Sequence, residues 1–136
     1  MKDPSVLLAD DNRPLMMRVA EHLGSSFNVV GTAVNGKDLI SLALQLKPDV
    51  IVVDITMPVL TGIEAVHQLR NARLKAKFIF LTLHNESEFL KACLEVGAVG
   101  YVLKTQIKND LIPAINAALA GKQFVSSGVS MSDDRD

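Results

Sequence analysis

The chain has 136 residues, 49% of them hydrophobic and 21% charged, so it can bury one ordinary core but not two full domains. Lysine and arginine total 14 against 15 aspartate and glutamate residues, and this balance excludes a global attraction to nucleic acid or anionic lipid. Because no apolar run approaches the roughly 20 residues that span a bilayer, and a single cysteine cannot form an internal disulfide, we expect a cytoplasmic protein without membrane contact.

Five short apolar runs alternate with stretches of helical periodicity. The runs, which we predict to be strands, cover residues 5–9, 27–33, 50–53, 78–81 and 99–103. Apolar spacing predicts a helix after each run: the first capped by Asp11 or Asn12, the second entered at Asn35-Gly36 and stopped at Lys47-Pro48, the third opened by Thr61-Gly62, and the others over 86–96 and 107–120.

Strands that are apolar on both faces and alternate with helices indicate a parallel sheet covered on each side. Right-handed crossovers turn this pattern into an α/β fold, a five-stranded doubly wound (βα)5 sheet. We assign residues 1–121 to this domain, with Gly121 as a C-terminal cap. Residues 122–136 are small and polar, and we interpret them as a flexible tail or the start of a linker.

Polar residues stand where the predicted strands end. Asp10 and Asp11 follow the first strand, Asp54 follows the third, Thr82 the fourth and Lys104 the fifth. In a parallel α/β sheet these ends share one edge, so the side chains should converge in one crevice. Carboxylates this close repel one another unless a cation neutralises them, and all-oxygen ligands suit Mg²⁺ rather than zinc.

With a divalent ion bound, Asp54 can act as a nucleophile toward phosphorus while Lys104 stabilises charge on the transferred oxygens. Thr82 can donate a hydrogen bond to one of these oxygens. Glycine-rich nucleotide-binding motifs are absent from the sequence, which argues against a bound nucleotide. The site therefore suggests phosphoryl transfer from a donor other than a bound nucleotide.

The same residues are also compatible with purely structural roles and with other functions. A single strand-terminal aspartate is more often a helix cap than a catalytic group, and only its combination with the other residues favours function. A phosphohydrolase of the haloacid dehalogenase type would need a second aspartate two residues after the nucleophile, where this chain has Thr56. A pure interaction module would not need the acidic residues and Lys104 together.

Four ordered motifs resemble the receiver domains of two-component response regulators over about residues 5 to 121. They are Leu8-Ala9-Asp10-Asp11, the stretch from Val53-Asp54 through Met57-Pro58 to Gly62, Leu81-Thr82, and Gly100-Tyr101-Val102-Leu103-Lys104. This resemblance implies a CheY-like, flavodoxin-like fold with strand order 2-1-3-4-5. The second half is most similar to the subfamily of LuxR, NarL and FixJ type.

The resemblance also implies a role for each site residue. Asp54 would be the phosphoacceptor, and Lys104 would contact the phosphoryl group. Mg²⁺ would be held by Asp11, Asp54 and the backbone carbonyl of Thr56, with Asp10 acting indirectly through water. Thr82 and Tyr101 match the family's switch pair, although plain packing of Tyr101 is equally compatible with the sequence.

Two positions depart from the family pattern. Thr105 follows Lys104 where many receivers have a proline, so we expect a trans peptide bond and a different loop. Leu83 follows Thr82 where a small residue is usual, which predicts a tighter entrance for the phosphoryl group.

The implied partners are a sensor histidine kinase, a second copy of the chain after phosphorylation, and DNA only through an output domain outside this chain. The surface expected to change is the face of the fourth helix, fifth strand and fifth helix, with Cys93, Ile107 and Leu111 on it.

Overall fold

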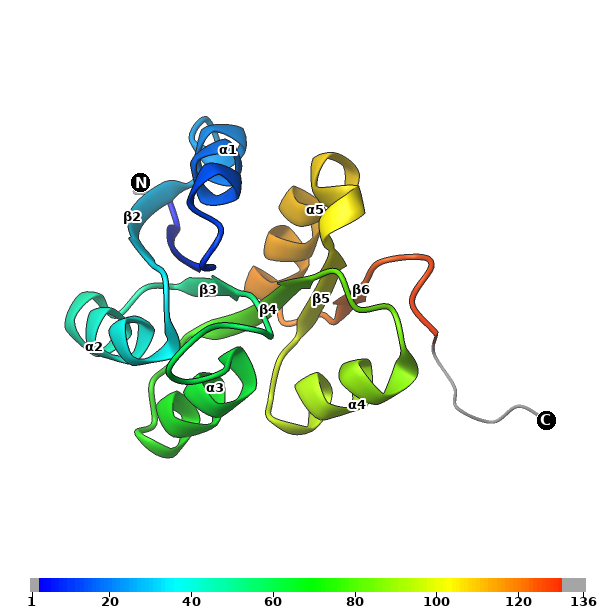
Figure 1. Ribbon diagram of the computed structural model, residues 1–136. Coiled ribbons are helices and arrows are strands. Elements are labelled where there is room, and N and C mark those ends of the chain that lie inside the picture. The colour runs from blue at the N-terminus through cyan, green and yellow to red at the C-terminus, as the bar shows by residue number, and fades with distance from the viewer. Residues whose placement is uncertain (1–2, 131–136) are drawn as a thin grey trace.

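In the computed structural model, which describes residues 3–130, a central parallel sheet carries helices on both faces (Figure 1). The strands are β1 (Ser5–Ala9), β2 (Asn28–Ala33), β3 (Val50–Val53), β4 (Lys77–Thr82), β5 (Gly100–Leu103) and β6 (Phe124–Val125). The helices are α1 (Arg13–Leu23), α2 (Gly36–Leu46), α3 (Gly62–Asn71), α4 (Ser87–Glu95) and α5 (Ile107–Leu119), with a 3-10 turn η1 (Lys104–Gln106) before α5.

The sheet order is β2-β1-β3-β4-β5-β6, and each neighbouring pair is parallel. The predicted α/β class and the order of the first five strands are therefore confirmed. In Figure 1, α1 and α5 lie on one side of the sheet, and α2, α3 and α4 lie on the other. None of the helices within residues 3–130 is long and apolar enough to cross a membrane.

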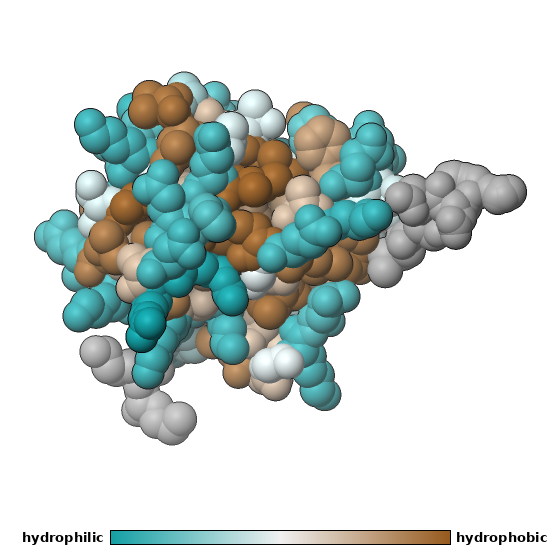
Figure 2. Space-filling view, turned by 90° about the horizontal axis from the view of Figure 1, so that it is seen from below, coloured by the Kyte–Doolittle hydropathy of each residue, from teal (hydrophilic) through white to brown (hydrophobic). Residues whose placement is uncertain are grey.

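The buried strands divide their side chains between two cores because successive residues of a strand point to opposite faces. In β3, Ile51 and Val53 join the core beneath α2, α3 and α4, whereas Val50 and Val52 join the core beneath α1 and α5. Figure 2 views the α3 and α4 side, where hydrophobic surface is interspersed with hydrophilic side chains. The long apolar runs in the sequence thus reflect burial on both faces.

Local signals set the helix starts that lie next to the site. The Asn12 side chain accepts a hydrogen bond from the amide of Leu15 and caps α1, which settles the choice between Asp11 and Asn12. Thr61 and Glu64 form a reciprocal capping box at the start of α3. Gly121 has a φ of 77° just after α5, the left-handed conformation that a C-terminal cap requires.

The interpretation of residues 122–136 as a flexible tail is wrong for residues up to 130. Residues 124 and 125 form the sixth strand, which pairs with Gly100 and Tyr101 of β5, and Ser126 and Val129 are buried. The polar composition of this segment concealed its spaced apolar residues, and an edge strand such as β5 can accept one more partner. Residues 131–136 lie outside the described residues, so the domain boundary itself stays a prediction.

The surface expected around α4, β5 and α5 also needs correction. Cys93 and Leu111 are fully buried, each in one of the two cores, and only Ile107 of the three named residues is partly exposed. Their helical spacing marks the inner faces of α4 and α5. Cys93 and Leu111 therefore cannot form part of an exposed surface in this conformation.

Candidate functional site

The sheet brings the strand-end residues to one edge. The amide of Asp10 donates to the carbonyl of Ala33, and the amide of Asp54 donates to the carbonyl of Ala9, so the ladder extends just beyond the strands. Carboxylate oxygens of Asp10, Asp11 and Asp54 all lie within 4.8 Å of one another. The convergence expected for these three side chains is present in the structure.

Lys104 enters this cluster from the end of β5. Its Nζ lies 2.7 Å from Asp10 Oδ2 and 3.3 Å from Asp54 Oδ2. Asp10 and Asp54 are buried, and the Lys104 side chain is largely shielded from solvent, so these pairs are stronger than pairs on an open surface. One ammonium group therefore balances two buried carboxylates.

The electrostatics of Asp54 reflect opposing effects. Burial raises the pKa of Asp54, the positive charge of Lys104 lowers it, and the neighbouring carboxylate of Asp10 raises it again, with a net rise. Burial would lower the pKa of Lys104, but the hydrogen bond and charge of Asp10 and the charge of Asp54 outweigh burial and raise it. The cluster therefore carries excess negative charge that a further cation would relieve.

The donor set fits a hard divalent ion. Asp11 is exposed while Asp10 and Asp54 are buried, so the cluster has one side open to water. Asp10 already uses Oδ1 to accept a hydrogen bond from the amide of Asn12 at 2.9 Å and Oδ2 to face Lys104. Three carboxylates with room for water suit Mg²⁺, which retains part of its hydration shell. The engaged oxygens of Asp10 agree with an indirect role for this residue.

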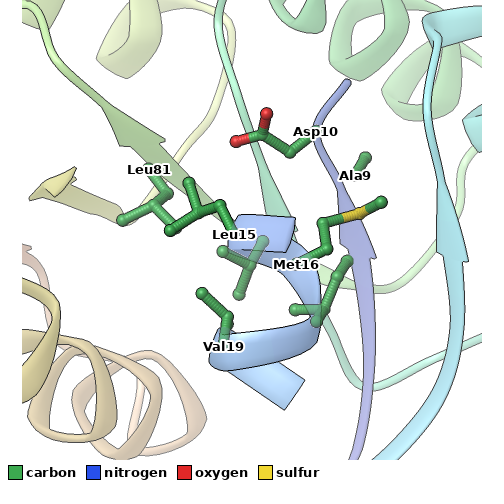
Figure 3. A pocket seen from close by; sticks show the side chains of 8 residues that line it. Ala9, Asp10, Leu15, Met16, Val19 and Leu81 are labelled. Atoms are coloured by element: carbon green, nitrogen blue, oxygen red, sulfur yellow. The ribbon is translucent and has the colours of Figure 1, made fainter. Parts of the chain in front are cut away.

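A small apolar cavity lies beside the carboxylates but does not extend the site. It is lined by Leu15, Met16 and Val19 of α1 and by Leu81 of β4, with Asp10 at its rim (Figure 3). Its volume is about 10 Å³, which is room for one water molecule at most. This cavity is therefore too small to hold a substrate.

Thr82 and Tyr101 meet at a third residue, His84. The fully buried Thr82 accepts a hydrogen bond at Oγ1 from the His84 amide at 3.2 Å. The Tyr101 ring is also fully buried, and its hydroxyl donates to the His84 carbonyl at 2.7 Å. Burial raises the pKa of Tyr101 well above its usual value, so the phenol keeps its proton. The structure thus connects both candidate switch residues to the loop before α4.

Sequence reasoning missed this role of His84. Its ring stacks on Phe89 of α4 with centroids 4.0 Å apart and an interplanar angle of 15°. The available signal was an aromatic residue five positions on, at the first turn of a predicted helix. The backbone groups of His84 that bind Thr82 and Tyr101 carry no signal in a sequence.

The two departures from the family pattern have clear structural outcomes. The peptide bond between Lys104 and Thr105 is trans, as expected, since the described residues contain no cis bond. The loop tightens into the 3-10 turn η1, which leads directly into α5. Leu83, expected to narrow the entrance, extends into solvent with 71% of its surface exposed.

Comparison with known proteins gives one family. The model of the response regulator receiver domain matches residues 6–116. An uncharacterized transcriptional regulatory protein of Bacillus subtilis, YxjL, is 40% identical over 120 residues, covering 86% of this chain and 55% of the relative. The nitrate/nitrite response regulator NarL of Escherichia coli is 33% identical over 132 residues, covering 95% of this chain and 61% of NarL. The chain thus spans somewhat more than half the length of these relatives.

Solved structures give the same result. A LuxR-family two-component response regulator from Aurantimonas aligns with a TM-score of 0.89 and 29% identity, over 94% of this chain and 93% of that one. RcsB, in a structure of two dimers bound to two parallel DNAs, aligns with a TM-score of 0.85 and 28% identity, over 94% of this chain and 66% of RcsB.

Proposed function

Since the chain belongs to the response regulator receiver domains, a regulatory rather than a catalytic family, we propose that it accepts a phosphoryl group on Asp54 and changes conformation in response. The observation that carries the proposal is the position of Asp54, buried beside the carboxylates of Asp10 and Asp11 with Lys104 at 3.3 Å. A buried carboxylate beside a fixed ammonium group suits attack on phosphorus, because the cation stabilises the charge that develops on the phosphoryl oxygens.

In the proposed reaction, an oxygen of Asp54 forms a bond to phosphorus while the bond from phosphorus to the donor breaks. The electron pair of the broken bond leaves with the donor, whose leaving atom then takes a proton from water where it needs one. Lys104 pairs with the transferred oxygens. Thr82 donates its hydroxyl hydrogen to one of them, which requires its Oγ1 to leave the His84 amide.

Mg²⁺ is the proposed cofactor. Asp11, Asp54 and the backbone carbonyl of Thr56 would hold it, and Asp10 would act through water, in keeping with its hydrogen bond to Asn12 and its pairing with Lys104. When bound, the ion supplies charge neutralisation for the phosphoryl oxygens and the carboxylates. Its binding would also reduce the excess negative charge described above.

The switch would pass through His84. Movement of Thr82 toward the phosphoryl group would release the His84 amide, and the His84 carbonyl is the acceptor that holds the Tyr101 hydroxyl. The loop before α4 would then change together with Tyr101. A change of a few hydrogen bonds suffices when a partner binds one conformation better than the other.

The proposed donor is a sensor histidine kinase, and a cytoplasmic location accompanies it because a kinase draws its phosphoryl groups from ATP. DNA would be bound only by an output domain outside this chain, as the greater length of the relatives suggests. A homodimer that forms on phosphorylation is the proposed assembly, supported by the DNA-bound dimers of RcsB. Its surface would involve the exposed parts of α4, β6 and α5 rather than the buried Cys93 and Leu111.

Intact-mass spectrometry tests the function directly. Incubation with Mg²⁺ and acetyl phosphate should add one phosphoryl group to the wild-type chain and none to Asp54→Asn. Omission of Mg²⁺ should prevent the addition, and Asp11→Asn should slow it while weakening Mg²⁺ binding. A phosphoryl group on Asp54→Asn, or none on the wild type at saturating donor, would overturn the proposal.

A further inference from the structure

The turn that carries Lys104 is held by a side chain from the segment that follows α5. Ser126 Oγ accepts a hydrogen bond from the amide of Leu103 at 3.1 Å and donates one to Asp110 Oδ2 at 2.7 Å. Ser126 is 3% exposed; its bond to the Leu103 amide is buried, and its bond to Asp110 is partly buried. One hydroxyl thus connects the end of β5 to the first turn of α5.

This arrangement follows from the short length of β6. The strand pairs with Gly100 and Tyr101, and the Ser126 amide extends the ladder by donating to the carbonyl of Tyr101 at 2.9 Å. The Leu103 amide lies beyond the reach of that strand, in a residue that is 7% exposed. A buried amide needs an acceptor, and the Ser126 hydroxyl takes the place of the missing strand carbonyl.

The two hydrogen bonds of Ser126 lie on either side of Lys104, the residue proposed to contact the phosphoryl group. Lys104 follows Leu103 directly and begins the turn η1, which ends at Gln106 just before α5. The Ser126 hydroxyl accepts a hydrogen bond from the Leu103 amide before this turn and donates one to the Asp110 carboxylate after it. The direction in which Lys104 leaves the backbone, and therefore the place of its Nζ between Asp10 and Asp54, depends on how this turn is held.

We propose that Ser126 is a positioning residue for Lys104, and that the segment over residues 122–130 belongs to the phosphoryl-transfer unit. The inference rests on the proposed function, in which Lys104 contacts the transferred group. It assigns a role in that site to a segment that the sequence pattern had placed outside the domain. Ser126 acts through the Leu103 amide and Asp110 and does not itself reach the reacting atoms.

The test compares Ser126→Ala with Ser126→Thr, which keeps the hydroxyl, and with Ser127→Ala, a change at the exposed neighbouring serine. Full-length chains are phosphorylated with acetyl phosphate at saturating Mg²⁺, and the rate is followed against donor concentration. Misplacing a reacting group by a fraction of an ångström lowers a rate steeply, so Ser126→Ala should lower the maximal rate roughly tenfold. Ser126→Thr and Ser127→Ala should stay near the wild-type rate.

A second readout separates positioning from general loosening of the fold. The chain has one tyrosine and no tryptophan, so Tyr101 fluorescence can follow Mg²⁺ and beryllofluoride binding. Ser126→Ala should weaken the binding of beryllofluoride, which occupies the phosphoryl position. It should leave Mg²⁺ affinity unchanged, because the proposed metal ligands lie in the segments that follow β1 and β3. Should Ser126→Ala fail to fold, Asp110→Ala removes only the second anchor and is measured in the same way.

A double-mutant cycle with Lys104→Ala decides the proposal. If Ser126 acts through Lys104, its replacement should slow phosphorylation of the wild type but not of Lys104→Ala. An equal slowing in both backgrounds, or a wild-type rate and beryllofluoride affinity in Ser126→Ala, would overturn the inference. The wild-type chain is the separate control for the proposed function, which fails if that chain takes up no phosphoryl group.

Discussion

The hydroxyl of Tyr101 donates a hydrogen bond to the carbonyl of His84 at 2.7 Å, from a ring that is fully buried. This bond holds the loop before α4 against the centre of β5. Tyr101→Phe keeps the ring and removes the donor, leaving the carbonyl without this partner. We expect a loss of about 1 kcal/mol in the free energy of unfolding.

Urea denaturation measures this loss, and amide hydrogen exchange locates it. Exchange should accelerate at residues 84–86 in Tyr101→Phe, while the amides of β1 on the far side of the sheet keep their wild-type protection relative to global stability. If neither stability nor loop exchange changes, the bond does not restrain the loop.

The raised pKa of Asp54 makes stability depend on pH. For an acid whose pKa is raised on folding, the stabilising contribution is present below the ordinary pKa of 3.8 and disappears as pH rises through the folded value. At pH 7, well above the ordinary pKa, the buried carboxyl group of Asp54 therefore lowers stability when no divalent cation is bound. Asp54→Asn should melt at a higher temperature than the wild type under these conditions.

Calorimetry with a chelator present tests this at pH 7 and again near pH 3, where both side chains are neutral and the difference should shrink. Added Mg²⁺ should raise the melting temperature of the wild type more than that of Asp54→Asn, because the variant lacks one charged ligand. A lower melting temperature for Asp54→Asn in chelator at pH 7 would contradict the expected sign.

Much of the fold could be predicted because its causes are local or topological. Runs buried on both faces, such as residues 50–53, identify parallel strands, and Thr61 with Glu64 marks a helix start. Once the sheet is parallel, Asp10, Asp54 and Lys104 must share one edge, so their proximity follows without side-chain detail.

The rest depends on contacts between distant parts of the chain. Ser126 lies in a polar stretch, and only the vacant side of β5 gives Phe124 and Val125 a strand to pair with. His84 is joined to the site through its backbone amide and carbonyl, which every residue possesses. Patterns of side chains could reveal neither relationship.

Val59 marks a strained turn beside the site. Its φ is 71°, its side chain is 77% exposed, and the amide of Leu60 donates to the carbonyl of Pro58 at 2.8 Å across it. A β-branched residue is unfavourable at a positive φ, and asparagine adopts a positive φ more readily. Val59→Asn should therefore raise the free energy of unfolding by about 1 kcal/mol. Urea denaturation compares this variant with Val59→Ala, which lacks the polar side chain of asparagine. If Val59→Asn gained no free energy of unfolding over the wild type, the turn would be unstrained.

The lifetime of the phosphorylated form should depend on Thr56 and His84, the residues two beyond Asp54 and Thr82. Neither side chain is a carboxamide or carboxylate suited to orient an attacking water, and the His84 ring is held against Phe89. We therefore expect slow hydrolysis and a several-fold faster decay when Thr56→Asn and His84→Glu are combined. Loss of the added phosphoryl mass after removal of the donor gives the rate, with each single variant as a control. An unchanged decay rate would mean that these side chains do not reach the water.

Gly62 and Asp54 approach each other too closely for any larger residue at position 62. The amide of Gly62 donates to the carbonyl of Ile55 at 2.8 Å, and a Cβ atom on Gly62 would overlap the backbone carbonyl of Asp54. Backbone cannot rotate aside as a side-chain tip can, so either α3 or the end of β3 must move. Gly62→Ala should lower the free energy of unfolding by about 2 to 3 kcal/mol, the range for overpacking a buried site. Because the displaced group is Asp54 itself, Mg²⁺ affinity should fall as well.

Gly24→Ala is the matched control, since Gly24 has an ordinary helical φ of −62° and a Cβ there would meet its nearest heavy atom at 3.3 Å. Equal stability and Mg²⁺ affinity for the two variants would show that the loop after Asp54 yields to the extra methyl group and does not fix the position of the carboxylate.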